Sequence, residues 1–274
     1  MSKQLENIFS LEGKVAVVTG AGVLGAVLCE ALAVAGAKVA ILNRTEEKAI
    51  ALAEQLKEIQ SGVLTFQCDV TDENRLKEVC EQIVAQWGKI DILLNGAGGN
   101  MPGATISPEQ TVFDMKLDDF KKVMDLNLIG SILPSLVFGK EMAKQKKGVI
   151  INLSSMTAQQ AVTRVFGYSV SKAAIDNFTR WMAVEMALKF GEGIRVNAIA
   201  PGFFIGDQNR KLLTNVDGTY TARGNTIITN TPMKRFGKPN ELVGALLWLV
   251  SDASSFVTGV IVPVDGGFSA FSGV

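Results

Sequence analysis

Short runs of apolar residues alternate along this chain with longer stretches in which apolar and polar positions are mixed. The first run, Val15–Thr19, is closed by Gly20 and is typical of a strand buried on both faces. The next stretch, 23–35, is rich in Ala, Leu and Val, and Gly36 is placed to end it as a helix. The same alternation predicts strands at 39–42, 63–68, 90–94, 148–153, 194–199 and 260–264, and helices at 45–59, 72–86, 117–144, 167–190 and 239–250.

Strands that are apolar along their whole length, with helices between them, indicate a parallel sheet covered on both faces. We therefore expect a single α/β domain over residues 1–274, with a doubly wound parallel sheet of about seven strands. Two segments, 97–116 and 201–238, fit no helix or strand well. Both follow the carboxyl ends of strands, where ligands bind in such sheets, so we expect them to be functional loops.

Composition narrows the classes of function. Lys and Arg number 27, as do Asp and Glu, so a formal net charge of zero gives no general reason to bind nucleic acid or an anionic membrane. The chain has no histidine, which excludes Ser-His-Asp catalysis and histidine-ligated zinc, and no metal site is expected. Its three cysteines form no C-x-x-C pair, and it shows neither a signal-like N-terminus nor ~18 consecutive apolar residues. We expect a cytoplasmic protein.

A glycine-rich turn joins the first strand to the first helix. Its sequence is T-G-A-G-V-L-G, from Thr19 to Gly25. Glycines allow a tight turn and a close approach of the backbone to a pyrophosphate, which then lies at the positive end of the helix. The pattern alone is weak and fits an ordinary strand–helix turn. Its position between strand and helix favours a dinucleotide site.

Tyr168 and Lys172 are four residues apart in a predicted helix, so they lie on one face and can reach one ligand. The pKa of a free tyrosine is about 10, and a nearby cation favours the ionised phenol. The pair could pass a proton to or from a substrate oxygen. Taken alone, the two residues are better explained by a solvated helix face.

Further polar and turn-forming residues fall near the carboxyl ends of several predicted strands. Each has an ordinary structural explanation as a helix cap, a surface amide or a turn former. Together they outline the edge that a nucleotide would line. They are Asp69 and Val70 after the third strand, Asn95 and Ala97 at the fourth, Ser155 after the fifth, Pro201 and Gly202 after the sixth, and Asn127 in the long helix between the fourth and fifth.

With these motifs the chain resembles the short-chain dehydrogenase/reductase family over about residues 11–268. The resemblance implies a Rossmann-type fold, hydride transfer with a nicotinamide, and four catalytic residues. Ser155 would hold the substrate oxygen, and Tyr168 would be the general acid or base, its pKa lowered by Lys172 and by the oxidised nicotinamide. Lys172 would also bind the ribose, and Asn127 would hold a relay water. The cofactor residues it implies are Gly20, Gly22, Leu24, Gly25, Asn43, Arg44, Asp69, Val70, Asn95, Ala97, Tyr168, Lys172, Pro201 and Gly202.

The chain departs from the family pattern at three points. Only four residues separate Gly20 from Gly25, one fewer than in the family's glycine turn, which puts the contacts of Gly22 and Val23 in doubt. Gly96 replaces the second Asn of the motif that closes the fourth strand. Gly206 stands where the family has a Thr that could meet the nicotinamide amide.

The choice of cofactor depends on the end of the second strand. An acidic residue there would bind the adenosine 2′-hydroxyl and repel a 2′-phosphate. This chain has Asn43 and Arg44 instead, and an arginine can pair bidentately with a phosphate. The sequence favours NADP(H), with NAD(H) as the alternative. Arg44 could equally cap or solvate the following helix.

The segment 203–231 is the expected substrate lid. It is rich in amide and basic side chains, which suit a polyhydroxylated or anionic ligand, although a solvated surface loop would look the same. Candidate substrate contacts, besides Ser155 and Tyr168, are Asn100, Arg164, Asn209 and Arg210. The pattern resembles the sugar-acid branch of the family that interconverts D-fructuronate and D-mannonate, as in D-mannonate oxidoreductase (fructuronate reductase), and is similar to gluconate 5-dehydrogenases.

Three alternatives stay open at this point. The substrate could be a polyol or another ketone, or a 3-oxoacyl thioester as in 3-oxoacyl reductases. The chain could also be a non-catalytic dinucleotide-sensing protein on the same fold. The resemblance further implies a homotetramer in which helices 117–144 and 167–190 meet their symmetry mates.

Overall fold

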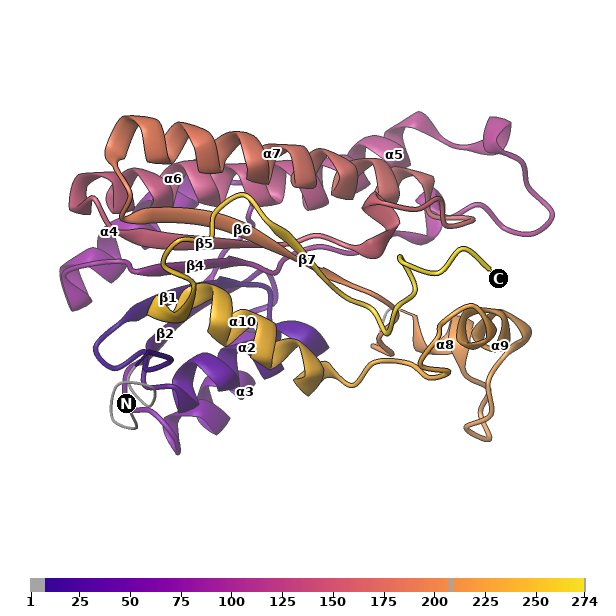
Figure 1. Ribbon diagram of the computed structural model, residues 1–274, viewed down its shortest axis with the longest axis horizontal. Coiled ribbons are helices and arrows are strands. Elements are labelled where there is room, and N and C mark those ends of the chain that lie inside the picture. Colours follow the sequence, from indigo (N-terminus) through magenta and orange to yellow (C-terminus); the bar gives the residue numbers. More distant parts are fainter. Residues whose placement is uncertain (1–7, 207–208, 274) are drawn as a thin grey trace.

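The computed structural model describes residues 8–206 and 209–273, which form a doubly wound α/β fold (Figure 1). One parallel sheet of seven strands runs in the order β3-β2-β1-β4-β5-β6-β7, as the apolar runs predicted. Because the chain moves outward from β1 in both directions, the order reverses between β1 and β4, which is where such sheets bind ligands. The strands are β1 (Val15–Thr19), β2 (Lys38–Asn43), β3 (Val63–Gln67), β4 (Ile92–Asn95), β5 (Gly148–Leu153), β6 (Ile194–Pro201) and β7 (Ile261–Val264).

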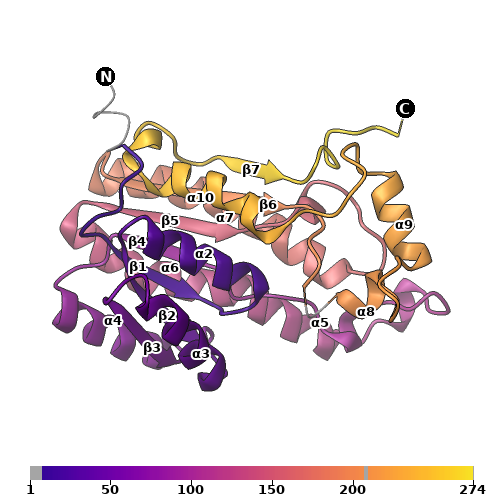
Figure 2. The same ribbon diagram turned by 90° about the horizontal axis from the view of Figure 1, so that it is seen from below.

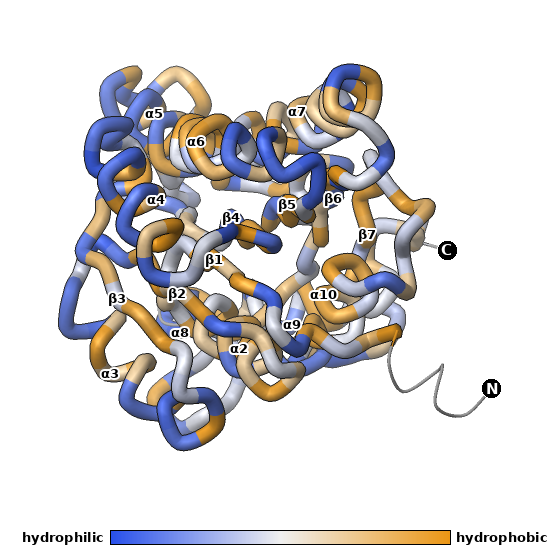
Figure 3. The backbone as a smooth tube through the Cα atoms, turned by 90° about the vertical axis from the view of Figure 1, so that its left-hand side faces the viewer, coloured by the Kyte–Doolittle hydropathy of each residue, from blue (hydrophilic) through white to orange (hydrophobic). Residues whose placement is uncertain are grey.

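Helices cover both faces of the sheet. Helices α4, α6 and α7 lie on one face and α2, α3 and α10 on the other (Figures 1 and 3). Helices α8 and α9 stand beyond the carboxyl ends of the strands (Figure 2). The bounds are α2 (Val23–Val34), α3 (Glu46–Lys57), α4 (Glu73–Trp87), α5 (Leu117–Met124), α6 (Gly130–Gln145), α7 (Phe166–Phe190), α8 (Arg210–Leu213), α9 (Ala222–Thr229) and α10 (Val243–Val250).

A hydrophobic core lies on each face of the sheet, and each central strand contributes side chains to both. In β1, Val15 and Val17 belong to the core under α4, α6 and α7, whereas Ala16 and Val18 belong to the core under α2, α3 and α10. Successive side chains of a strand point to opposite faces, so a strand between two helical layers must be apolar at every position. This is the physical reason for the uninterrupted apolar runs in the sequence.

The long helix expected at 117–144 is interrupted. Helix α5 ends at Met124, a π-helical turn spans Asp125–Ile129, and α6 begins at Gly130. The buried Asn127 lies in this turn and donates a hydrogen bond to the Val123 carbonyl over 2.9 Å. Such turns are frequent at functional sites. By length and composition alone the run Leu117–Gln145 could cross a membrane, but α6 packs against α4, α7, β4 and β5.

The second long segment, expected to lack regular structure, contains the short helices α8 and α9. Leu213, Ile227 and Phe236 bury their side chains together and give it a small core of its own. The Thr221 hydroxyl caps α9 by accepting a hydrogen bond from the Gly224 N–H. The segment is therefore a packed element at the carboxyl edge of the sheet, of which residues 207 and 208 lie outside the described residues.

Candidate active site at the carboxyl edge of the sheet

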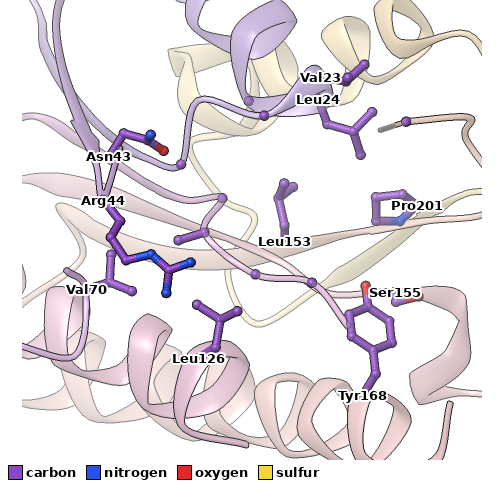
Figure 4. A pocket seen from close by; sticks show the side chains of 18 of the residues that line it. Val23, Leu24, Asn43, Arg44, Val70, Leu126, Leu153, Ser155, Tyr168 and Pro201 are labelled. Carbon is purple, nitrogen blue, oxygen red and sulfur yellow. The ribbon is translucent and has the colours of Figure 1, made fainter. Parts of the chain in front are cut away.

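A cavity of about 450 Å³ follows the carboxyl ends of the strands. The glycine turn, the ends of β2 and β3 and the loop after β4 line one end of it, and Ser155, Tyr168 and Lys172 line the other (Figure 4). Its remaining lining, from the predicted set, consists of Gly20, Gly22, Leu24, Gly25, Asn43, Arg44, Asp69, Val70, Ala97, Pro201, Gly202 and Asn209. The carboxyl edge thus brings together residues that lie far apart in the sequence.

The four-residue glycine turn closes by direct backbone packing. Gly20 has a left-handed φ of +86°, and a side chain carbon built on Gly25 would lie 2.1 Å from the Gly20 carbonyl oxygen. Gly22 is the N-cap of α2 and has no side chain to cap the helix, so the first N–H groups of α2 are free to meet an anion. The shortened turn therefore still leads directly into a helix N-terminus that lines the cavity.

Two of the positions at which the chain departs from the family pattern, Val23 in the shortened glycine turn and Gly206, lie close together. A carbon built on Gly206 would have Val23 as its nearest neighbour, at 3.9 Å. Val23, the residue whose contacts the short turn put in doubt, lines the cavity, and so does Gly206. A larger side chain at 206 would therefore fill the part of the cavity next to Val23.

The end of the cavity next to β2 is basic. Arg44 reaches across the cavity toward Val70 (Figure 4), and Lys48, which the sequence analysis did not single out, lines the same end. Burial tends to raise the pKa of Asp69, but hydrogen bonds from Thr71 and the charge of Arg44 outweigh it and lower that pKa.

The Asn43 side chain forms hydrogen bonds to the glycine turn and to the residues that follow β2. Its oxygen accepts a hydrogen bond from the Ala21 N–H at 3.0 Å, and its amide donates to the Thr45 carbonyl at 2.7 Å. Asn43 therefore ties the glycine turn to the end of β2.

Ser155, Tyr168 and Lys172 converge at the other end of the cavity. Ser155 caps a short 3-10 turn by accepting a hydrogen bond from the Thr157 N–H at 3.2 Å, and its side chain lies beside the Tyr168 ring (Figure 4). The ammonium of Lys172 lies 5.5 Å from the centroid of the Tyr168 ring and donates to the Leu153 carbonyl at 2.6 Å.

The protein's own residues shift the pKa of Tyr168 upward, not downward as the resemblance implied. Burial raises this pKa, and the hydrogen bond with Ser155 opposes it only in part. The Lys172 ammonium lies over the ring and donates its hydrogen bond to the Leu153 carbonyl.

Lys172 is 3% exposed, and burial lowers its pKa to about 8, opposed by the charge of Asp176. Asp176, one turn further along α7, is also buried and is hydrogen-bonded to the Ser154 hydroxyl. The sequence analysis missed Asp176. Its spacing of four residues from Lys172 was the available signal.

The side-chain amides of Asn127 and Asn95 donate hydrogen bonds to other parts of the protein. Neither residue lines the cavity. Asn127 donates to the carbonyls of Gly99 and Val123 and accepts from the Gly99 N–H, so its side chain holds the loop after β4. Asn95 donates to Ser135 and to Asn152, each over 2.8 Å. In this structure both amide nitrogens donate within the fold, while the buried Asn95 oxygen has no hydrogen-bond partner among the described residues. A water held at Asn127 and a cofactor contact at Asn95 stay predictions.

Of the four further substrate candidates, only Asn209 lines the cavity. Its side chain accepts from the Gly206 N–H and donates to the Phe204 carbonyl, so it also shapes the start of the lid. Asn100 donates to the Thr105 hydroxyl at 2.8 Å, and Arg210 is exposed at the start of α8. Arg164 lies in the loop between Ser155 and Tyr168 with a left-handed φ of +77°. None of these last three residues lines the cavity, and their contact with a substrate stays a prediction.

Comparison with known proteins agrees with this geometry. A family model described as enoyl-(acyl carrier protein) reductase matches residues 20–269. The chain belongs to the short-chain dehydrogenase/reductase family. Within it, an uncharacterized oxidoreductase of Bacillus subtilis (strain 168) is 50% identical over 275 residues, with 97% of this chain and 98% of the relative covered.

Two solved structures carry cofactors. A Haemophilus influenza protein provisionally named a D-mannonate oxidoreductase, solved with bound NAD, is 44% identical with a TM-score of 0.91 and covers 97% of this chain and 98% of its own. A gluconate 5-dehydrogenase from Burkholderia cenocepacia J2315, in complex with NADP and tartrate, is 30% identical with a TM-score of 0.86 and covers 97% of this chain and 99% of its own. This short-chain dehydrogenase/reductase is therefore a nicotinamide-dependent oxidoreductase.

Proposed function

We propose that this enzyme interconverts a carbonyl group and a secondary alcohol on a sugar acid. The observation that carries the proposal is the meeting of Ser155, Tyr168 and Lys172 at one end of a cavity whose other end is the glycine turn. The turn fits a nicotinamide dinucleotide because it offers free N–H groups at the start of α2 and leaves no room for a side chain at Gly25. A nicotinamide bound there supplies or accepts the hydride.

The chain's own residues have distinct tasks in this proposal. The Ser155 hydroxyl donates a hydrogen bond to the substrate oxygen, and Tyr168 gives that oxygen a proton or removes one. Lys172, buried and charged below a pKa of about 8, favours the phenolate when the proton leaves and is placed to hold the nicotinamide ribose. Asn127 keeps the loop after β4 next to Lys172, since a carbon on Gly98 would lie 2.8 Å from the Asn127 oxygen and 3.4 Å from the Lys172 nitrogen.

We propose NADP(H) as the favoured cofactor. Arg44 and Lys48 both line the adenosine end of the cavity, and the end of β2 carries no carboxylate that would repel a 2′-phosphate. NAD(H) is the alternative, supported by the NAD bound in the Haemophilus relative. The two are separated by the experiment below.

The proposed substrate class rests on the lid and the relatives. The names of the two solved relatives both refer to sugar acids, and one of these structures also holds tartrate, a small hydroxylated dicarboxylate. The lid of this chain places Asn209 at the cavity and carries basic residues on α8 and α9. Hydroxyl and carboxylate groups suit these side chains better than an apolar chain does.

The testing experiment has two stages. The protein is first titrated with NADPH and NADH separately, following nicotinamide fluorescence, and we expect tighter binding of NADPH. Turnover of D-mannonate and D-gluconate is then measured against the matching polyols, D-mannitol and D-glucitol. Binding of cofactor with no turnover across a broad carbonyl and alcohol panel would support the dinucleotide-sensing alternative. Binding of neither cofactor would show that the shortened glycine turn has disabled the site, and would overturn the proposed reaction.

A further inference from the structure

The lid begins beside the strand end that leads to Ser155. The Ser154 N–H donates to the Ile199 carbonyl at 2.8 Å, which joins the end of β5 to β6 two residues before β6 ends at Pro201. Pro201 lies on the side of the cavity that also holds Ser155 (Figure 4). The lid segment follows directly, so its first residues border the end of the cavity proposed for hydride transfer.

A few residues later, the lid lies next to the glycine turn. A carbon built on Gly206 would have Val23 as its nearest neighbour, at 3.9 Å, and both residues line the cavity. The start of the lid thus spans the cavity from the segment of Ser155 to the glycine turn. A dinucleotide with its pyrophosphate at the start of α2 and its reacting ring at Tyr168 would have to place its nicotinamide under this span.

Among the described residues of the lid, Asn209 alone brings a polar side chain to the cavity, since the others that line it are Phe204 and Gly206. The Asn209 Oδ1 accepts a hydrogen bond from the Gly206 N–H, and its Nδ2 donates to the Phe204 carbonyl, each over 2.8 Å. Because a backbone N–H needs an acceptor and a carbonyl needs a donor, these two contacts fix which atom of the amide is the oxygen. A side-chain amide has two N–H donors and an oxygen with two lone pairs, so one donor and one lone pair remain beyond these bonds.

We infer that Asn209 binds the carboxamide group of the nicotinamide. A carboxamide carries one carbonyl and one NH2 group, which would pair with the remaining donor and lone pair of Asn209. Gly206 has no side chain that could take this role, and the space beside it is open. The pairing would fix the rotation of the nicotinamide ring, and with it the face that is turned to Tyr168. The inference rests on the nicotinamide dependence of the enzyme, and it leaves the sugar-acid proposal to the relatives and to the basic residues of the lid.

Binding of cofactor analogues tests this assignment without turnover. Calorimetric titrations compare the oxidised nicotinamide dinucleotide with its 3-acetylpyridine analogue, which has a methyl group in place of the carboxamide NH2, and with the ADP-ribose part alone, which has no ring. All three ligands carry the 2′-phosphate or all lack it, according to the form that the wild type binds more tightly. The proteins are the wild type, Asn209→Ala and the control Asn225→Ala. This control removes an exposed lid amide that donates to the Tyr220 carbonyl at 3.2 Å and does not line the cavity.

The wild type should bind the dinucleotide about threefold to tenfold more tightly than the acetylpyridine analogue, because the analogue lacks the N–H that the Asn209 oxygen accepts. In Asn209→Ala, affinity for the dinucleotide should fall by about the same factor or more, and the two dinucleotides should bind equally. ADP-ribose should bind to this variant as it does to the wild type. Asn225→Ala should keep the wild-type preference.

A preference for the carboxamide that is the same in the wild type and in Asn209→Ala would overturn the inference, as would a wild type that binds both dinucleotides equally. Equal losses for ADP-ribose and the dinucleotide would reduce Asn209 to a residue that shapes the lid, and would overturn it too. The expected preferences in an enzyme that turns over no sugar acid would refute the proposed reaction alone. Turnover of sugar acids with a preference that is indifferent to Asn209 would refute the inference alone.

Discussion

At the scale of single residues, the decisive feature is a buried ammonium that has no direct carboxylate partner. Lys172 donates to the Leu153 carbonyl, and the nearby Asp176 is hydrogen-bonded to the Ser154 hydroxyl. Asp176 therefore supports the charge of Lys172 through space without neutralising it in an ion pair. The Lys172 ammonium therefore keeps its charge beside the Tyr168 ring.

Replacing Tyr168 with Phe should abolish proton transfer and leave the cavity intact. We expect turnover to fall about a hundred- to ten-thousand-fold, the usual contribution of a general acid or base. Cofactor affinity, measured by nicotinamide fluorescence, should change little, because the ring that packs over Lys172 is kept. Turnover that survives the substitution would show that another group moves the proton.

Replacing Asp176 with Asn should lower the pKa of Lys172 below its value of about 8. The carboxylate favours the ammonium, so its removal leaves the effect of burial unopposed. If the ammonium helps to hold the cofactor, affinity falls as the pH rises through the Lys172 pKa, and in the variant this fall comes at lower pH. Cofactor dissociation constants measured from pH 6 to 10 check this, with the exposed Asp118→Asn as the control. An unchanged midpoint would contradict the coupling.

Removing Arg44 tests the choice of cofactor. Arg44→Ala should weaken NADPH binding about ten- to a hundredfold while NADH binding changes much less, because a charge-assisted hydrogen bond to the 2′-phosphate is lost. Lys48→Ala should act in the same direction with a smaller effect, since a lysine presents a point charge and no bidentate fork. Equal losses for both cofactors would indicate that Arg44 contacts the adenosine and does not read the phosphate.

The sequence allowed the candidate catalytic residues to be identified, but it did not reveal which neighbouring residues contact them. Tyr168 and Lys172 could be paired by their spacing on a helix, and the structure brings them to one cavity. The buried partners of Asn95, the loop contacts of Asn127 and the burial of Asp176 could not be foreseen. These depend on which neighbouring elements cover a side chain, and local spacing carries no such information.

At the scale of elements, the glycine turn and the segments around it form one supporting unit. Asn43 holds the turn from β2, the Gly25 backbone packs on Gly20, and Gly206 leaves the space beside Val23 open. A turn shortened by one residue is thus supported from neighbouring segments, which explains how it retains a usable helix N-terminus.

Gly25→Ala should damage this unit. The added carbon would lie 2.1 Å from the Gly20 carbonyl oxygen, so the turn or α2 must move. Overpacking of this kind costs about 1–3 kcal/mol of stability. We expect a lower melting temperature and weaker binding of both cofactors. In Gly22→Ala the new carbon has no neighbour within 4 Å, so this variant should melt like the wild type. Equal melting of all three proteins would show that the turn is not closely packed.

The elements that the sequence predicted best are those with the strongest periodicity. The strand at Gly148–Leu153 was predicted at its observed bounds, and the helix beginning near 167 is α7. The π-helical turn at Asp125–Ile129 was missed because its cause, the hydrogen bonds of Asn127 to a distant loop, is tertiary. Helices α8 and α9 were missed because four and eight residues are too few for a clear period.

At the scale of the whole molecule, the reversal of strand order places every proposed contact along one edge. The β1 and β4 neighbours supply the glycine turn and the loop after Asn95, and the outer strands supply the catalytic end and the lid. This assembly could be predicted, because carboxyl ends of parallel strands always share an edge. The apolar pattern could not decide which apolar side chains stay exposed on the surface of this subunit.

The outer face of α7 is where we expect a second copy of the chain to pack. Trp181, Val184 and Leu188 are 62%, 59% and 77% exposed, and their spacing puts them on one stripe of the helix. Ile175 and Ala183, also on α7, are instead buried in this subunit. A self-complementary stripe on a helix of 25 residues suits a twofold interface, the unit from which a tetramer is built.

Trp181→Glu should break that interface, because it places a charge at the centre of an apolar contact and removes a large aromatic side chain. Light scattering after size exclusion should give the mass of four chains for the wild type and of one or two for the variant. Ile50→Glu, on the exposed surface of α3 on the opposite side of the sheet, should leave the mass unchanged. A wild type that runs as a monomer, or a Trp181→Glu variant with unaltered mass, would show that the stripe on α7 does not hold subunits together.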